Sequence, residues 1–150
     1  MTHSSYSVVT DITQGENVRL YDQVNLYSCT FGDGTKVDAF VYIEEDVVIG
    51  SNCIIRPFTF IPTGITIGNE VFIGPHVTFT NDRYPSVEGE WTLLQTTVGD
   101  RAAIGAGATI CPGVEIGHDA TIGAGSVVLD DVPPKATVVG NPACPISTEQ

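Results

Sequence analysis

Hydrophobic residues recur at every sixth position over most of the chain. From Ile104 to Val128 the sequence divides into IGAGAT, ICPGVE, IGHDAT and IGAGSV, and an aliphatic residue opens each unit. The fifth position of each unit is small or valine: Ala108, Val114, Ala120 and Ser126. A six-residue repeat predicts a coil that stacks on itself, because helices repeat about every 3.6 residues and strands about every two. We therefore expect an all-β fold, a parallel β-helix.

The same phase runs through the first half of the chain and is broken once. Nine aromatic or aliphatic residues stand six apart: Phe31, Val37, Ile43, Ile49, Ile55, Ile61, Ile67, Ile73 and Phe79. The repeat resumes at Val98, nineteen places after Phe79, which is one more than a multiple of six. We predict that the coil is interrupted there by an extruded loop at about residues 82–95.

The two ends of this single domain depart from the repeat. Residues 1–17 are polar and aperiodic, which predicts a loose arm or a short strand that covers an edge. Aliphatic residues within 18–30 are out of step with the later units, so we expect an imperfect first coil that caps the open end. Regular coils are expected over 31–132 and a C-terminal extension over 133–150, because Pro133 and Pro134 cannot donate hydrogen bonds to a β-ladder.

The repeat also predicts which side chains stack. Three units make a coil of about eighteen residues, and neighbouring coils lie about 4.8 Å apart, so residues eighteen apart form columns. Phe40, Phe58 and His76 form one such column at a corner of the coil. Asp82 lies six residues after His76 and therefore belongs to another corner. Any joint action of His76 and Asp82 would need two subunits.

Composition limits the partners of the protein. The 150 residues carry a formal net charge of −12, from 6 Lys and Arg against 18 Asp and Glu, so neither nucleic acid nor an anionic membrane is expected to bind. A polyanionic ligand is repelled at long range as well. Its site must use backbone N–H groups and a few placed cations, drawn from Arg56, Arg83, Arg101 and Lys135.

Targeting signals and cysteine pairs are not evident in the sequence. The start, MTHSSYSVV, lacks the basic and apolar regions of a signal peptide, and no apolar run is long enough to span a membrane, so we expect a cytoplasmic protein. The cysteines show no C-x-x-C pair. Cys53 falls at an inward position of its unit, which predicts a packed thiol.

The six-residue units resemble the hexapeptide repeat of the left-handed parallel β-helix acyltransferases over about residues 31–143. Three segments, FIGPHVTFTNDRYP, TTVGDRAAIGAGATICPGVEIG and VVLDDVPPKATVVGNPA, look like the branch that acetylates amino groups of nucleotide-linked deoxysugars. The resemblance implies a homotrimer with active sites between adjacent coils. It also implies acetyl-CoA as co-substrate and a nucleotide-linked amino sugar as acceptor.

Two residues are candidates for catalysis. His76 is the histidine next to the FTNDRYP segment, and imidazole can accept the proton of an attacking amine near neutral pH. The alternative is that His76 only completes the column above Phe58. Asn81 could donate a hydrogen bond to the sugar or to the developing oxyanion, although an Asn-Asp pair is also ordinary turn chemistry.

Binding residues are assigned through the resemblance. Asp82 could orient the sugar amine, while Arg83 and Tyr84 could contact the diphosphate or the base, or simply face solvent. Ala106 and Ala124 are eighteen residues apart, and the family pattern aligns their backbone with the pantetheine arm of coenzyme A. They could equally be small corners. Lys135 is a candidate for the coenzyme phosphates.

Three other functions stay open at this point. An O-acetyltransferase acting on a sugar or an amino acid would use the same fold and co-substrate. A zinc carbonic anhydrase needs three histidine ligands, and the coil offers only His76 and His118, so we expect no metal. A non-catalytic β-helix scaffold would bind no coenzyme A.

Overall fold

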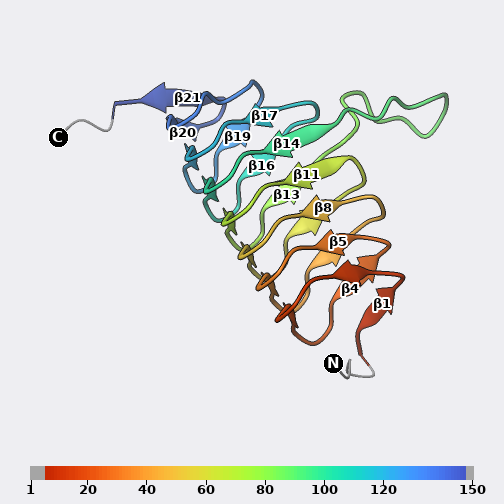
Figure 1. Cartoon of the computed structure of the whole chain (residues 1–150). Helices are drawn as coiled ribbons and strands as arrows, with labels where there is room; N and C mark the ends of the chain where they lie inside the picture. The colour runs from red at the N-terminus through yellow and green to blue at the C-terminus, as the bar shows by residue number, and fades with distance from the viewer. Residues whose placement is uncertain (1–5, 148–150) are drawn as a thin grey trace.

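The chain folds into a three-sided coil, described over residues 6–147 by a computed structural model (Figure 1). The backbone passes from a first sheet, A, to a second, B, and a third, C, and then returns to A one level higher. Neighbouring coils pair in parallel throughout. The predicted class, a left-handed parallel β-helix, is confirmed. Residues 6–147 include no helix that could cross a membrane.

Each side of the coil is one sheet of short strands. Sheet A contains β1 (Val8–Thr10), β4 (Asn25–Tyr27), β7 (Tyr42–Ile43), β10 (Phe60–Ile61), β13 (Thr78–Phe79), β16 (Thr109–Ile110) and β19 (Val127–Val128). Sheet B contains β2 (Thr13–Gln14), β5 (Thr30–Phe31), β8 (Val48–Ile49), β11 (Ile65–Ile67), β14 (Thr96–Val98) and β17 (Glu115–Ile116). Sheet C contains β3 (Arg19–Leu20), β6 (Lys36–Val37), β9 (Ile54–Ile55), β12 (Phe72–Ile73), β15 (Ala103–Ile104), β18 (Thr121–Ile122), β20 (Thr137–Gly140) and β21 (Ala143–Ile146).

The register explains why the repeat is so regular. In the central coils, partners lie eighteen residues apart, as in the pair Ile43 and Ile61. Across the interruption, Ile67 pairs with Val98, thirty-one residues away, so the excursion inserts 31 − 18 = 13 residues without changing the alignment. No strand lies between β13 and β14, where the sequence predicted the loop. In Figure 1 the loop projects from the side of the coil.

The core is a filled column of aliphatic side chains. All nine residues of the upstream series, from Phe31 to Phe79, have relative exposures of 1% or less. Cys53 is also fully buried, as predicted, and this burial raises the pKa of its thiol. Side chains alternate along each strand, so the residue next to each core position faces outward.

The two ends are closed differently from each other. β1 and β2 pair in parallel with β4 and β5, seventeen residues further on, so the coil already begins at Val8. At the other end the coil continues past Pro133 and Pro134 through β20, which pairs with β18. The prolines lie at a corner, where their missing N–H groups are not needed by a ladder. β21 then turns back antiparallel against β20 and closes the sheet.

Corners are named here by the sheets that they join. The A/B corner follows each strand of sheet A, the B/C corner follows sheet B, and the C/A corner follows sheet C. Most corners contain a residue in the left-handed region, and many of these residues are not glycine. Phe40, Phe58 and His76 adopt φ values of 63°, 65° and 58° at the C/A corner.

Adjacent residues of β9 test the alternation of buried and exposed side chains. Ile55 is fully buried and Ile54 is 38% exposed. An Ile55→Ala substitution is expected to lower the free energy of unfolding by about 2–5 kcal/mol, because it leaves a cavity in the core. Ile54→Ala, its matched control, is expected to cost less than about 1 kcal/mol. Chemical denaturation measures both, and equal losses would contradict the inward direction of the six-residue series.

Candidate active site

A stack of three rings occupies the lower part of the C/A corner. The rings of Phe40 and Phe58 are parallel to within 4°, with centroids 5.0 Å apart, and the His76 imidazole lies 4.9 Å from Phe58 at 13°. The predicted column is therefore confirmed. Both phenylalanines are about half exposed, and the backbone N–H of His76 donates to the carbonyl of Pro57. The stack fixes the plane of the imidazole and leaves its edge toward solvent.

Above His76 the same corner carries almost no side chains. The coil register places Gly107 and then Gly125 in the column of His76, and Ala106 and Ala124 in the column beside it. All four residues are exposed. A Cβ added at Gly107 or Gly125 would meet nothing within 4 Å, so the surface there is open. Ala106 and Ala124 thus line a bare strip that begins at His76.

Glycine is required at the base of this strip. A Cβ at Gly74, two residues before His76, would lie 2.7 Å from the Ala106 nitrogen of the next coil. Gly105 meets the same limit, because its Cβ would approach the Ala124 nitrogen to 2.5 Å. Close approach of successive coils keeps the strip flat, and flatness suits an extended ligand whose amides contact the backbone.

Asn81 and Asp82 lie on the A/B corner, at the start of the excursion. The Asn81 Nδ2 donates to the carbonyl of Thr63, 2.9 Å away on the coil below. The Thr63 N–H in turn donates to a carboxylate oxygen of Glu44 at 3.0 Å. Asp82 accepts a hydrogen bond from the Tyr84 N–H at 3.0 Å, which closes an Asx turn. Each side chain therefore helps to shape the start of the loop.

Three predicted binding residues surround one cavity at this corner. Asp82, Arg83 and Tyr84 line a hollow of about 450 Å³ together with Glu90, Trp91 and Leu94. The Arg83 Nη2 donates to the carbonyl of Pro112 at 3.1 Å, which holds the guanidinium against the coil. Tyr84 is 83% exposed. The structure thus brings the substrate candidates together but keeps them on a different corner from His76.

Lys135 lies on the B/C corner, apart from Ala106 and Ala124. Its backbone N–H donates to the carbonyl of His118, which places it one coil above Asp119. Asp119 accepts two hydrogen bonds from Arg101, at 2.9 and 3.1 Å, and one contact from His118 at 2.8 Å. These partners lower the pKa of Asp119 to about 2. Arg101, a predicted phosphate candidate, is therefore already paired.

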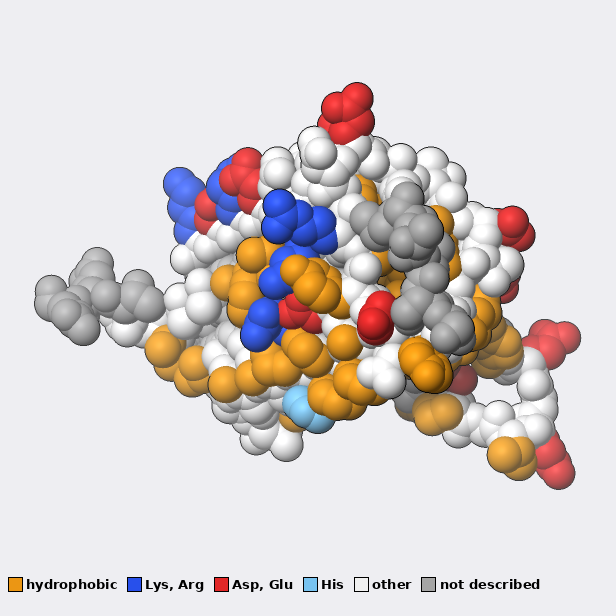
Figure 2. Space-filling view, turned by 90° about the horizontal axis from the view of Figure 1, so that it is seen from below, with side chains coloured by type: hydrophobic (Ala, Val, Ile, Leu, Met, Phe, Trp, Pro, Cys, Tyr) orange, Lys and Arg blue, Asp and Glu red, His pale blue; other side chains and the backbone are white. Residues whose placement is uncertain are grey.

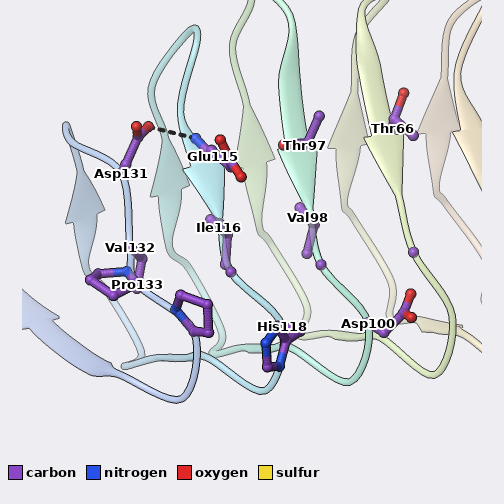
Figure 3. Close-up of a pocket in the computed structure, with 14 residues that line it drawn as sticks. Thr66, Thr97, Val98, Asp100, Glu115, Ile116, His118, Asp131, Val132 and Pro133 are labelled. Atoms are coloured by element: carbon purple, nitrogen blue, oxygen red, sulfur yellow. Dashed lines mark hydrogen bonds between the residues drawn. The ribbon is translucent and has the colours of Figure 1, made fainter.

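A shallow groove runs beside this corner, and sequence reasoning missed it (Figure 3). Thr66, Thr97 and Glu115 form one wall, and Asp100 and His118 lie at the other side. Near one end of the groove, the Glu115 N–H donates a hydrogen bond to Asp131 at 2.8 Å. Acidic lining makes the groove a poor match for phosphates. No three metal-ligating side chains cluster anywhere in the described part of the chain.

A group of cations lies below the ring stack and contains Arg56, one of the predicted candidates for an anionic ligand, with two cations that sequence reasoning missed. Asp38 is only 7% exposed, and its carboxylate contacts Arg56 Nη1 at 2.7 Å and Lys36 Nζ at 3.3 Å. Arg19 on β3 is the direct ladder partner of Lys36 on β6. We call Arg19, Lys36 and Arg56, with Asp38, the lower cation cluster. Asp38 and Arg56 are eighteen residues apart, so column arithmetic could have found their contact.

The repeat is recognised as that of a known family. The family described as bacterial transferase hexapeptide (six repeats) matches residues 28–63 and 95–130. The unmatched stretch between these two segments contains the His76 corner and the excursion. The family pattern thus covers the regular coils on either side of the candidate site.

Curated relatives are acetyltransferases of several kinds. Galactoside O-acetyltransferase of Escherichia coli is 33% identical over 75% of this chain and 60% of its own length. Serine acetyltransferase of Mycobacterium tuberculosis is 36% identical over 78% of this chain and 44% of its own length. The chain spans about half the length of the curated relatives that it matches.

Solved structures share the coil. PerB from Caulobacter crescentus, in complex with CoA and GDP-perosamine, superimposes with a TM-score of 0.68 at 28% identity, over 93% of this chain and 58% of that one. AntD, an N-acyltransferase from Bacillus cereus in complex with dTDP and 3-hydroxybutyryl-CoA, has a TM-score of 0.79 at 22% identity, over 96% and 83%. The likeness to AntD concerns the fold alone. With its six-residue core series, its three-sided coil and these relatives, the chain belongs to the hexapeptide-repeat acyltransferase superfamily.

Proposed function

We propose that the protein is an acetyl-CoA-dependent N-acetyltransferase that acts on the amino group of a nucleotide-linked amino-deoxysugar, in the cytoplasm. The observation that carries the proposal is the change in the C/A corner at His76, from filled columns below to an open strip above. An elongated donor fits the open strip, and an acceptor can then approach His76 from below. PerB, which shares the fold, was crystallised with CoA and a nucleotide-linked amino sugar.

The open strip fits the pantetheine arm of acetyl-CoA. Ala106 and Ala124 present backbone amides at an exposed corner, and no side chain crosses the surface at Gly107 or Gly125. Bound there, the co-substrate would supply a thioester carbonyl next to the imidazole edge. Lys135 lies on the B/C corner, away from this strip, so no role in binding the coenzyme phosphates is proposed for it.

Chemistry at this point needs little from the protein. The neutral acceptor amine attacks the thioester carbonyl, a C–N bond forms, and the C–S bond breaks as the thiolate leaves. His76 accepts the proton that the nitrogen loses, because imidazole titrates near neutral pH. An amide donor such as Asn81 would stabilise the oxyanion during the attack.

Because His76 is separated from Asn81 and Asp82, we infer that a complete active site forms only between two copies of the chain. His76 precedes β13, whereas Asn81 and Asp82 follow it, so the two groups lie on different corners of the same chain. A homotrimer in which the C/A corner of one subunit faces the A/B corner and excursion of the next would bring both groups to one cleft. In that arrangement Asp82 would orient the amine, and Arg83 and Tyr84 would contact the nucleotide.

A second candidate function is O-acetylation of a sugar, which the match to galactoside O-acetyltransferase favours. The two reactions differ in what they require of His76. A hydroxyl must be deprotonated as it attacks, whereas a neutral amine is already a nucleophile. The acceptor panel described next separates these two reactions.

The proposed reaction predicts free thiol from the correct acceptor. Purified protein mixed with acetyl-CoA and a panel of nucleotide-linked amino sugars is expected to release coenzyme A at a rate proportional to enzyme. A thiol-reactive dye measures the release. The matched control panel carries hydroxyl groups in place of the amines. Turnover of the hydroxyl compounds alone would favour O-acetylation, and no turnover with folded protein would contradict both reactions.

A His76→Phe variant tests the base without disturbing the stack. Phenylalanine already occupies two corners of this column in the same backbone conformation, so the ring column should be retained. We expect kcat to fall about 100-fold at neutral pH, in the range typical for loss of a general base. The acetyl-CoA KM should stay unchanged. An unaltered kcat would show that the leaving thiolate takes the proton.

An Ala124→Trp variant tests the open strip. The side chain faces solvent, so the fold should tolerate a larger residue there. We expect the acetyl-CoA KM to rise at least about 10-fold, a loss of about 1.4 kcal/mol of binding, with little change in the acceptor KM. Initial-rate kinetics with each substrate varied in turn will measure this. An unchanged acetyl-CoA KM would place the donor elsewhere.

A further inference from the structure

We propose that the lower cation cluster is the binding site for the diphosphate of the acceptor, and that donor and acceptor therefore lie end to end along one corner with His76 between them. This inference rests on the proposed function and extends it, because it assigns a substrate group to residues that take no part in the reaction proposed above. Four observations support it.

The first observation is the uneven distribution of positive charge. Three of the six Lys and Arg residues, Arg19, Lys36 and Arg56, lie on three consecutive coils of one side. Among residues 6–147, Asp38 is the only acidic residue that forms an ion pair with any of them. Figure 2, which views the N-terminal end of the coil, shows Lys and Arg side chains gathered beside hydrophobic ones. A positive patch on a chain of net charge −12 attracts an anion locally while the remaining surface repels it.

The second observation is that Arg19 lies beside Lys36 without a carboxylate partner of its own. Arg19 and Lys36 are direct partners on neighbouring parallel strands, and like charges placed directly opposite each other destabilise a sheet. No described carboxylate lies within ion-pair distance of Arg19. A bound phosphate would remove this repulsion.

The third observation is that the cations are held in position beforehand. The nearly buried Asp38 carboxylate contacts both Arg56 and Lys36. The guanidinium has five N–H donors, and the bond to Asp38 takes one of them, so the group can still contact phosphate oxygens. The Lys36 ammonium also lies 5.2 Å from the centre of the Tyr21 ring. Tyr21 is 46% exposed and offers an aromatic surface at the lower end of the cluster.

The fourth observation is the position of the cluster relative to His76. Tyr21, Asp38, Arg56 and Gly74 follow one another in a single column, and His76 is two residues beyond Gly74. Arg56 is thus one coil below His76, or about 5 Å along the axis, and Lys36 is two coils below it, or about 10 Å. A hexose ring between the amine and the diphosphate spans a comparable length. In the same column above, Gly105 and Gly123 replace the charged residues.

The phosphates of coenzyme A are the other source of the same chemistry. We assign the cluster to the acceptor because the donor strip begins at His76 and continues in the opposite direction, through Ala106 and Ala124. If the donor phosphates used the cluster instead, the pantetheine arm would have to cross the exposed rings of Phe40 and Phe58. The experiment below separates the two sources.

The test compares Arg19→Gln and Arg56→Gln with Arg101→Gln, which removes one cation from the B/C corner. For the two cluster variants we expect the KM of the nucleotide-linked acceptor to rise at least 5-fold, while the acetyl-CoA KM changes less than 2-fold. The control should change neither value. Arg19→Gln is the cleaner variant, because Arg56→Gln also deprives the buried Asp38 of a partner. Circular dichroism and a thermal melt of each variant check the fold.

A binding measurement makes the test independent of turnover. UDP, dTDP and GDP are titrated into wild-type protein and the variants by calorimetry, at low and high salt. We expect at least one diphosphate to bind wild type, with a Kd that rises with salt and rises at least 5-fold in Arg19→Gln.

Several outcomes would overturn the inference. A change in the acetyl-CoA KM alone would assign the cluster to the coenzyme, and equal use of a free amino sugar and its nucleotide-linked form would remove the need for a diphosphate site. Either result would leave N-acetylation intact. If no amine is acetylated but diphosphate binding still depends on Arg19, the proposed function fails and the anion site stands.

Discussion

The parallel hydrogen-bond ladder between successive coils is the constraint on which this structure depends. It fixes the central coils at eighteen residues, so every position lies above its counterpart in the coil below. The inward side chains of successive coils then form one continuous core, and the outward side chains stack in columns along the axis. A side chain is consequently surrounded by residues from other coils rather than by its neighbours in sequence. The surface chemistry of the protein is organised along the axis for this reason.

The C/A corner shows what such a column can do. Its lower part carries Tyr21 and the ion pair of Asp38 with Arg56. The His76 imidazole lies beside the middle of the column, and the upper part contains only glycine. Two elongated ligands can lie along the same corner without overlapping, because its lower and upper parts present different groups. The high net negative charge helps here, since it confines anions to the few places where cations are held together.

Much of the fold was predictable because one signal repeats many times. The buried series from Phe31 to Phe79, the ring column ending at His76 and the position of the excursion all follow from the six-residue phase. The first coil was less accessible to this reasoning. β1 and β2 pair at an interval of seventeen, and the polar Gln14 occupies the position directly below the buried Phe31, so the periodic signal is lost although the ladder continues.

The candidate site was predictable only in part. Column arithmetic separated His76 from Asp82 correctly, since His76 precedes β13 and Asp82 follows it. It did not place Lys135, because the thirteen inserted residues and the shorter last coil hide which corner that residue occupies. The contact of Lys36 with Asp38 depends on how the two side chains bend toward each other at the end of β6. The packing of the excursion depends on a loop that has no repeat. Neither has a signature in a periodic pattern.

The excursion lengthens one coil from eighteen to thirty-one residues, yet the strands on both sides keep their partners. The pairing of the strands therefore does not depend on the length of a loop inserted at a corner. A segment of this kind can be exchanged, shortened or enlarged during evolution while the core and the open strip stay as they are. Acceptor preference and scaffold stability can therefore diverge separately in this architecture, and a transplanted loop is a natural route to a new substrate.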